Sequence, residues 1–227
     1  MPYQLSKLIL GPGLRLLART EVIGKENVPA QGGAILASNH LSVLDSFYLP
    51  LFLDRPVIFA AKSEYFTGTR PFERIAGAYM RATNQLSVDR TAARAGQEML
   101  EAALKRLQDG ELFGIYPEGT RSPDGRLYRG RTGVGWLALR SGAPVIPVAM
   151  IGTNRLLPPG HVVPHPGRIQ IRFGRPLGFG EYAGQPAGAR QRRSVTDQVI
   201  ESIRELSGQE YDPIYASVRK EQLGRLP

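Results

Sequence analysis

Short apolar runs that alternate with helical patterns constrain the fold of this chain more than any other feature of its sequence. The runs are rich in residues that favour β-strands and are bounded by polar or turn-forming segments. They are Ala34–Ala37, Val57–Ala60, Leu112–Tyr116, Val145–Ile151 and Ile169–Phe173. Strands that are separated by helices predict an α/β fold, in which helices flank a layered, mixed and largely parallel sheet.

The helical patterns lie between these runs and after the last run. The clearest are Ala92–Gln108, which Gly110 ends, and Ser194–Leu206, which Gly208 ends. Weaker candidates are Asp45–Leu53, Arg70–Tyr79 and Val134–Ser141. The sequence has no internal repeat, so we expect one main domain over residues 21–208. A segment at 1–20 precedes it and a C-terminal arm at 209–227 follows it.

The N-terminal segment consists of two short amphipathic stretches, Leu5–Leu10 and Leu14–Ala18, separated by Gly11-Pro12-Gly13. This break argues against a signal peptide, and the sequence lacks the roughly 20 consecutive apolar residues of a spanning helix. Two interpretations stay open. The segment packs on its own domain, which the pattern alone favours, or it lies in a membrane surface with its cations on lipid headgroups.

The charge and the absence of cysteine limit the chemistry that this chain can perform. Lys and Arg number 29 against 20 Asp and Glu, a net charge of +9 that favours nucleic acid, anionic lipid or a phosphorylated substrate. Without cysteine there is no disulfide, no thiolate nucleophile and no cysteine-bound metal. Aromatic residues make up 8% of the chain and are not interleaved with basic ones, so no nucleic-acid partner is expected.

The first polar segment that follows an apolar run is Ser38-Asn39-His40-Leu41-Ser42-Val43-Leu44-Asp45. An imidazole removes hydroxyl protons near neutral pH, and a carboxylate on its other nitrogen orients the ring. The spacing of His40 and Asp45 suits a histidine in the turn and an aspartate in the first turn of a helix. The alternative is structural, because Ser42-x-x-Asp45 also marks a helix start whose carboxylate caps backbone amides.

The second polar segment, Tyr116-Pro117-Glu118-Gly119-Thr120-Arg121-Ser122, follows the run Leu112–Tyr116. Gly119 permits a sharp turn, and the planar guanidinium of Arg121 suits a phosphate. Glu118 would repel phosphate, so we expect its carboxylate to bind a hydroxyl group or to orient an arginine. A solvated loop with an exposed Arg–Glu pair is the competing interpretation.

Two further residues have a possible role in binding. Arg90 follows the alternating stretch Asn84–Asp89 at a predicted strand-to-helix junction, where it could bind a phosphate or form a surface ion pair. Pro147 lies in the apolar strand Val145–Ile151, and a proline there indicates an edge strand or a bend.

Taken together and in this order, these blocks resemble the four motifs of the glycerolipid acyltransferase family, whose best-known members are the lysophosphatidate acyltransferases. The resemblance covers residues 24–176, and its Pro-Glu-Gly-Thr-Arg-Ser block is highly specific. It implies the family's α/β fold, with His40 as general base and Asp45 as its orienting partner. It assigns Pro147 to the acyl-donor region, and it assigns the binding of the glycerol phosphate to Arg90, Glu118, Gly119, Thr120 and Arg121.

The sequence departs from the family motifs at three positions. Asn84 stands where the second motif usually has glycine, Tyr116 replaces the usual phenylalanine, and Arg131 stands where many members have lysine. Asn84 in place of glycine is expected to affect the shape of the acceptor pocket.

The resemblance implies transfer of a fatty acyl group from an acyl thioester to the sn-2 hydroxyl of 1-acyl-glycerol-3-phosphate, giving phosphatidic acid. Acyl-CoA or acyl-carrier protein would be the donor and a lysophospholipid the acceptor, with no cofactor and no metal. The chain has no cysteine and no Gly-x-Ser-x-Gly nucleophile, so direct attack by the acceptor hydroxyl is expected. The pair His161 and His165 is interpreted as a loop.

A lipid acceptor also changes the expectation for the N-terminal segment. We expect a peripheral protein on the cytoplasmic face of the cell membrane, bound through this segment and its positive charge to anionic lipid, without a transmembrane helix. The alternatives are the same chemistry on glycerol-3-phosphate, another lysophospholipid or a glycolipid, and a basic membrane- or nucleic-acid-binding protein without catalysis.

Overall fold

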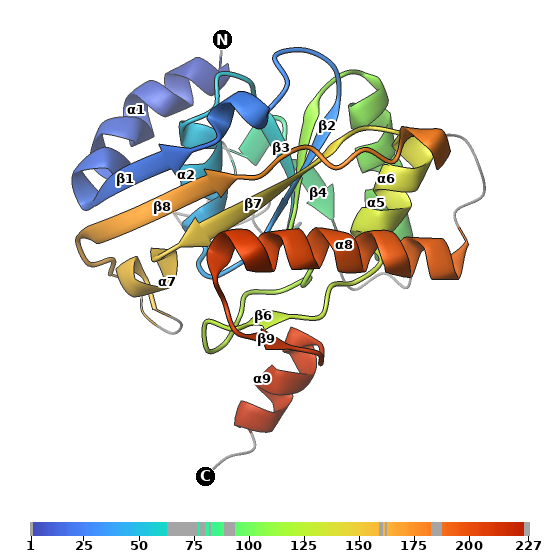
Figure 1. Cartoon of the computed structure of the whole chain (residues 1–227). Helices are drawn as coiled ribbons and strands as arrows, with labels where there is room; N and C mark the ends of the chain where they lie inside the picture. The colour runs from blue at the N-terminus through green and yellow to red at the C-terminus, as the bar shows by residue number, and fades with distance from the viewer. Residues whose placement is uncertain are drawn as a thin grey trace.

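A seven-stranded sheet lies between two layers of helices in the computed structural model of the chain (Figure 1). The structure describes residues 2–62, 77, 80–81, 83–88, 94–158, 161, 163–182 and 188–224. The strands of the sheet are β1 (Ala18–Ile23), β2 (Ala34–Ser38), β3 (Val57–Lys62), β4 (Leu86–Val88), β5 (Leu112–Ile115), β7 (Val145–Ile151) and β8 (Gly167–Phe173). Their order is β1-β8-β7-β2-β5-β3-β4, and all neighbours are parallel except β7 and β8. The predicted mixed, largely parallel α/β fold is therefore confirmed.

The helices cover both faces of this sheet. They are α1 (Pro2–Leu17), α2 (Asp45–Leu51), α5 (Ala95–Gln108), α6 (Gly133–Ser141), α7 (Thr153–Leu156), α8 (Ala189–Ser207) and α9 (Ala216–Gly224), with short 3-10 turns η1 (Lys25–Asn27) and η2 (Gly180–Tyr182). Helices α5, α6 and α8 pack on one face, and α1 and α2 pack on the other. The predicted helix Arg70–Tyr79 falls almost entirely outside the described residues.

Strand β2 forms the centre of the sheet and is completely buried. Its side chains alternate between the two cores, with Ile35 and Ala37 facing α5, α6 and α8, and Ala34 and Leu36 facing α2. Its parallel neighbours are β5 and β7. The apolar run predicted from the sequence is therefore continuous because both faces of the strand are covered.

The N-terminal segment forms one helix rather than the two pieces expected from the sequence. Helix α1 runs through Gly11-Pro12-Gly13. A Cβ atom at Gly11 would lie 3.2 Å from Leu51, so the helices α1 and α2 pack closely where the break was predicted. Residues 18–20, which we assigned to this segment, belong to β1. Packing on the sheet and on α2 outweighs the low helix propensity of the tripeptide.

The prediction that Pro147 marks an edge strand is wrong, and the pairing of the strands explains why. Strand β7, which contains Pro147, lies between β2 and β8 and is not an edge strand. The register of β7 and β8 ends at the pair Val148–Phe173, so Pro147 lies beyond the ladder, and its carbonyl accepts a hydrogen bond from the Gly174 N–H at 2.8 Å. The proline has no N–H group, but the ladder between β7 and β8 therefore loses no hydrogen bond.

Asn84 has a backbone angle φ of 57°, in the left-handed region that glycine favours. Asparagine tolerates this region better than most residues do. Its side-chain oxygen also accepts a hydrogen bond from Arg106 at 3.1 Å. Asparagine at position 84 thus adopts a backbone turn of the kind that glycine favours.

The C-terminal arm folds back onto the domain. Strand β9 (Tyr211–Asp212) pairs in parallel with β6 (Leu127–Tyr128), and α9 follows at the lower end of the molecule in Figure 1. Helix α1 lies at the opposite, upper end of the view. None of the helices in the described part of the chain is long and apolar enough to cross a membrane.

Candidate active site

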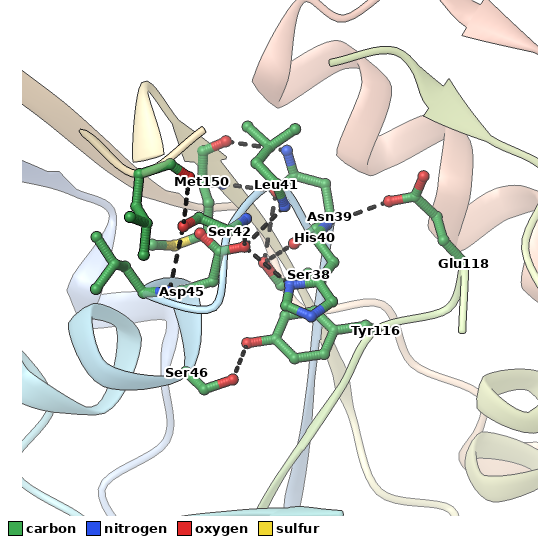
Figure 2. Close-up of polar contacts among 12 residues, drawn as sticks. Ser38, Asn39, His40, Leu41, Ser42, Asp45, Ser46, Tyr116, Glu118 and Met150 are labelled. Carbon is green, nitrogen blue, oxygen red and sulfur yellow. Dashed lines mark hydrogen bonds and ion pairs between the residues drawn. The ribbon is translucent and has the colours of Figure 1, made fainter. Parts of the chain in front are cut away.

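The two polar loops singled out in the sequence meet at one edge of the sheet (Figure 2). One follows β2 and the other follows β5, and the carboxyl ends of neighbouring parallel strands lie at the same edge. The Ser122 N–H donates a hydrogen bond of 2.7 Å to the His40 carbonyl. The loops are therefore joined at the residue that we expected to be the base.

His40 and Asp45 form a hydrogen-bonded pair in which His40 Nδ1 lies 2.9 Å from Asp45 Oδ2. Helix α2 begins at Asp45, so the histidine lies in the turn and the aspartate in the first helical turn. The same oxygen accepts hydrogen bonds from the backbone N–H groups of Leu41 at 2.7 Å and Ser42 at 2.8 Å. Asp45 is completely buried, whereas the His40 side chain is 16% exposed. The carboxylate thus both caps the turn and orients the imidazole, so the two interpretations of this motif are compatible.

Tyr116 packs against one face of the His40 imidazole. Its ring stacks on the His40 ring with centroids 3.8 Å apart and planes 10° apart, and its hydroxyl lies 2.8 Å from Ser46 Oγ. Burial and the nearby Asp45 carboxylate raise the pKa of Tyr116 well above its usual value, so the hydroxyl stays protonated. Tyr116 thus both stacks on the imidazole and bonds to α2 through its hydroxyl, a bond that phenylalanine could not form.

Asn39 fixes the strand end that precedes the histidine, a role that the sequence analysis missed. Its side chain accepts a hydrogen bond from the Met150 N–H at 2.7 Å and donates one to the Met150 carbonyl at 2.9 Å. It also donates a 2.7 Å bond to Gln209, which in turn donates one to the Gly125 carbonyl at 2.7 Å. Asn39 is completely buried. The backbone on which His40 is mounted is therefore tied to β7 and to the C-terminal arm.

Glu118 binds backbone amides rather than the hydroxyl or arginine that we expected. Its Oε1 accepts the His40 N–H at 3.2 Å, and its Oε2 accepts the Tyr128 N–H at 3.0 Å. The side chain is 1% exposed. Burial raises the pKa of Glu118 to about 8, although the two N–H donors oppose this shift. Glu118 thus binds the backbone N–H of His40, and Ser122 binds its carbonyl.

The raised pKa of Glu118 makes the stability of the protein depend on pH. The ordinary pKa of this group is 4.5, so between about pH 4.5 and 8 the folded protein keeps a proton that the unfolded chain has released. The free energy of unfolding therefore falls as the pH rises, by up to about 1.4 kcal/mol per pH unit from this group. Glutamine has no titratable proton at this position. In urea unfolding at about pH 5, 6.5 and 8, we therefore expect the free energy of unfolding of Glu118→Gln to decline less steeply with pH. Parallel pH profiles of the two proteins would contradict this assignment.

The turn after Glu118 presents the residues that we expected to bind a phosphate. Gly119 has a φ of 76°, and a Cβ atom there would lie 2.9 Å from Arg131, so glycine suits both the turn and the close approach. Thr120 Oγ1 accepts a hydrogen bond from Lys220 Nζ at 2.5 Å. Arg121 is exposed and forms no ion pair with the acidic residues that the structure describes. Its guanidinium is thus not neutralised by any acidic side chain that the structure describes, and it could bind an anion.

The other residues singled out in the sequence are Arg90, Pro147, His161 and His165. Arg90 lies outside the described residues. Pro147 is buried and pairs with Ala37, so it lies beside the end of the strand that precedes His40. His161 and His165 lie in a loop, with ring centroids 6.4 Å apart. In the part of the chain that the structure describes, no three His, Asp or Glu side chains lie close enough together to hold a metal ion.

The arrangement can perform general-base chemistry next to a bound anion. When Nδ1 carries the proton that it shares with Asp45, the lone pair of the imidazole is on Nε2, which can accept a proton from a hydroxyl group. Stacking, the carboxylate and two backbone bonds hold the ring in place. Arg121 lies one residue from Ser122, which binds the His40 carbonyl. The imidazole and the loop that carries Arg121 therefore lie side by side.

Comparisons with known proteins identify the family to which this chain belongs. A model of the Acyltransferase family matches residues 19–151, which is more than half of the chain. The 1-acyl-sn-glycerol-3-phosphate acyltransferase of Bacillus subtilis is 29% identical over 195 residues, which cover 85% of this chain and 90% of the relative. The chloroplastic acyltransferase LPAT1 of Arabidopsis thaliana, with the same description, is 29% identical over 162 residues, which are 70% of this chain and 44% of the relative.

A solved structure is similar as well. The crystal structure of the 1-acyl-sn-glycerophosphate (LPA) acyltransferase PlsC from Thermotoga maritima superposes with a TM-score of 0.64 at 29% identity. The superposition covers 84% of this chain and 73% of the other.

Proposed function

Because this chain belongs to the Acyltransferase family, we propose that it acylates the sn-2 hydroxyl of 1-acyl-glycerol-3-phosphate with a fatty acyl group from acyl-CoA or acyl-carrier protein. The product is phosphatidic acid. The observation that carries this proposal is the His40–Asp45 pair, held at 2.9 Å beside a loop that presents the exposed Arg121. The relatives described as 1-acyl-sn-glycerol-3-phosphate acyltransferases support the choice of acceptor.

The proposed reaction is a direct transfer between two bound substrates. His40 Nε2 takes the proton of the acceptor hydroxyl while the hydroxyl oxygen attacks the thioester carbonyl carbon. A C–O bond forms, and the C–S bond breaks as the tetrahedral intermediate collapses. The thiol has a pKa of about 8.5, so it leaves readily as a thiolate and takes up the proton held by His40. The buried Asp45 carboxylate stabilises the imidazolium that forms in between.

The acceptor is oriented through its phosphate. Arg121 offers a planar pair of donors for this group, and Arg90 is proposed to bind it as well. Glu118, Gly119 and Thr120 shape the turn that presents Arg121. We place the acyl donor beside β7, on the side marked by Pro147. Holding both substrates in line supplies much of the rate acceleration.

Helix α1 is proposed to hold the protein on an anionic membrane surface, from which it draws its lipid acceptor. One side of the helix packs on the domain, where Tyr3 donates a 2.6 Å hydrogen bond to the Pro50 carbonyl. The other side exposes apolar residues, among them Leu8 at 72% and Leu16 at 89%. The Tyr48 hydroxyl donates a 2.7 Å bond to the Leu14 carbonyl and so ties α1 to the helix that begins at Asp45. A peripheral location would therefore bring the site close to the lipid.

We expect the double variant Leu8→Gln/Leu16→Gln to bind anionic vesicles at least tenfold more weakly than the unchanged protein. Each leucine loses up to about 1.5–3 kcal/mol of apolar burial, and the net charge does not change. The control is Val218→Gln on α9, at the other end of the molecule, where 41% of the valine is exposed. Vesicle sedimentation measures the affinity. Equal loss in the control, or no loss in the double variant, would contradict the role of α1.

The test of the proposed function compares acceptors on anionic vesicles. Purified protein is given an acyl-CoA or an acyl-carrier protein together with lysophosphatidate, glycerol-3-phosphate or lysophosphatidylcholine. We expect phosphatidic acid from lysophosphatidate at a rate well above that of the other acceptors. Product from glycerol-3-phosphate alone would move the activity to that acceptor, and product from none would contradict the proposal.

A further inference from the structure

The C-terminal arm, residues 209–224 of the structure, is fixed to the loop that carries the proposed phosphate-binding residues. Besides the β6–β9 pairing, the Leu127 N–H donates to the Glu210 carbonyl at 2.9 Å and the Arg129 N–H to the Ile214 carbonyl at 3.0 Å. Strand β6 begins at Leu127, a short distance along the chain from the turn that contains Thr120 and Arg121. The pairing and these bonds therefore anchor the arm close to these two residues.

Side chains also orient α9 toward this loop. Arg219 Nε lies 3.5 Å from Asp124 Oδ2, and Arg131 donates a 3.3 Å hydrogen bond to Ser217. The guanidinium groups of Arg129 and Arg131 lie 5.5 Å and 5.4 Å from the centre of the Tyr215 ring. Such cation–π contacts contribute about 0.5–1 kcal/mol each at exposed sites. Helix α9 is thus docked by several independent contacts.

This docking places Lys220 at the turn. Its Nζ donates a 2.5 Å hydrogen bond to Thr120 Oγ1. Partial loss of hydration and then the neighbouring Arg121 guanidinium lower the pKa of Lys220, whereas the Glu118 carboxylate raises it. Lys220 forms no ion pair with a carboxylate among the described residues. Lys220 and Arg121 repel each other, and a bound phosphate would offset that repulsion.

We propose that Lys220 is an acceptor-binding residue, whose ammonium group contacts the acceptor phosphate together with Arg121. This inference rests on the proposed function. The Thr120 hydroxyl positions the ammonium group, and the arginine supplies the planar donors that lysine lacks. Lys220 lies beyond residue 151, where the match to the family ends, so the arm adds to the acceptor site a residue from outside the matched region.

The test compares Lys220→Met and Lys220→Arg with the control Lys105→Met, which removes an exposed lysine on α5. We expect Lys220→Met to raise the KM for lysophosphatidate about tenfold, because one charge-assisted bond is lost. The kcat should stay within about threefold, and the KM for the acyl thioester should not change. Lys220→Arg should restore most of the acceptor affinity, whereas a merely structural role would not depend on charge in this way.

A second readout does not need catalysis. Inorganic phosphate should raise the melting temperature of the unchanged protein relative to chloride at equal ionic strength, and should raise that of Lys220→Met less. Unaltered KM values together with equal phosphate stabilisation would overturn the proposal. A lower KM for lysophosphatidate in Lys220→Met would also overturn it, because the arm would then obstruct the acceptor. If the unchanged protein acylates no acceptor, the proposed function fails, and the phosphate readout still decides the role of Lys220.

Discussion

Replacement of His40 by alanine is expected to lower kcat about 10³-fold or more, because a positioned general base contributes roughly 10²–10⁴ to the rate. The imidazole is the group that removes the hydroxyl proton in the proposed reaction. Stacking on Tyr116 and the bond to Asp45 hold it at one position, so water cannot replace it efficiently. The KM for the acceptor should change much less, since the turn around Arg121 does not depend on the His40 side chain. Steady-state rates on vesicles that contain lysophosphatidate measure both constants.

His161→Ala is the matched control for this variant, because it removes an exposed histidine from a loop. It should retain the full rate. The melting temperature of His40→Ala should stay within a few degrees of that of the unchanged protein. A folded His40→Ala protein with more than a tenth of the original kcat would show that His40 is not the base.

Asp45→Asn should have the second largest effect, a fall in kcat on the order of 10³-fold. Three N–H groups converge on Asp45 Oδ2, from His40 Nδ1, Leu41 and Ser42. A neutral amide oxygen accepts these bonds more weakly than a carboxylate does, and an amide nitrogen in that place would donate to Nδ1 and leave the proton on Nε2. An imidazole in that tautomer cannot accept the hydroxyl proton.

Because Asp45 is buried and caps its turn, Asp45→Asn should also lower the stability, by about 1–3 kcal/mol. Urea unfolding separates this effect from the loss of activity. The control Asp197→Asn removes a carboxylate that pairs with Arg193 on α8, and its kcat should be that of the unchanged protein. Normal kcat in a folded Asp45→Asn protein would limit Asp45 to its capping role.

The parts of the fold that the sequence predicted well are those that local patterns specify. Strand β7 lies where the apolar run Val145–Ile151 placed it, and α6 begins one residue before the predicted Val134. Strand β1 was not predicted, because Arg19 and Glu21 are exposed and interrupt its apolar pattern. Its strand state depends on pairing with β8, which is far away in the sequence.

In the site, too, the sequence predicted contacts within one short segment better than contacts between distant segments. The spacing of His40 and Asp45 predicted a turn followed by a helix start, because both residues belong to one short segment. Glu118 was expected to bind a hydroxyl or an arginine, yet it accepts backbone N–H groups. Every residue except proline carries such a donor, so no residue pattern identifies the partner. Gln209 and Lys220 reach the site only because the arm folds back. No local sequence motif predicts either contact.

The measurement that tests the central claim most directly is a single-turnover reaction that begins without acceptor. Excess protein is mixed with an isotopically labelled acyl-CoA, and lysophosphatidate is added later. The proposed mechanism predicts that no labelled protein forms and little CoA is released before the addition. Afterwards CoA and labelled phosphatidic acid should appear together in equal amounts, at a rate that His40→Ala abolishes. A burst of CoA with the acyl group attached to the protein, or product formation by His40→Ala at the original rate, would contradict direct transfer with His40 as the base.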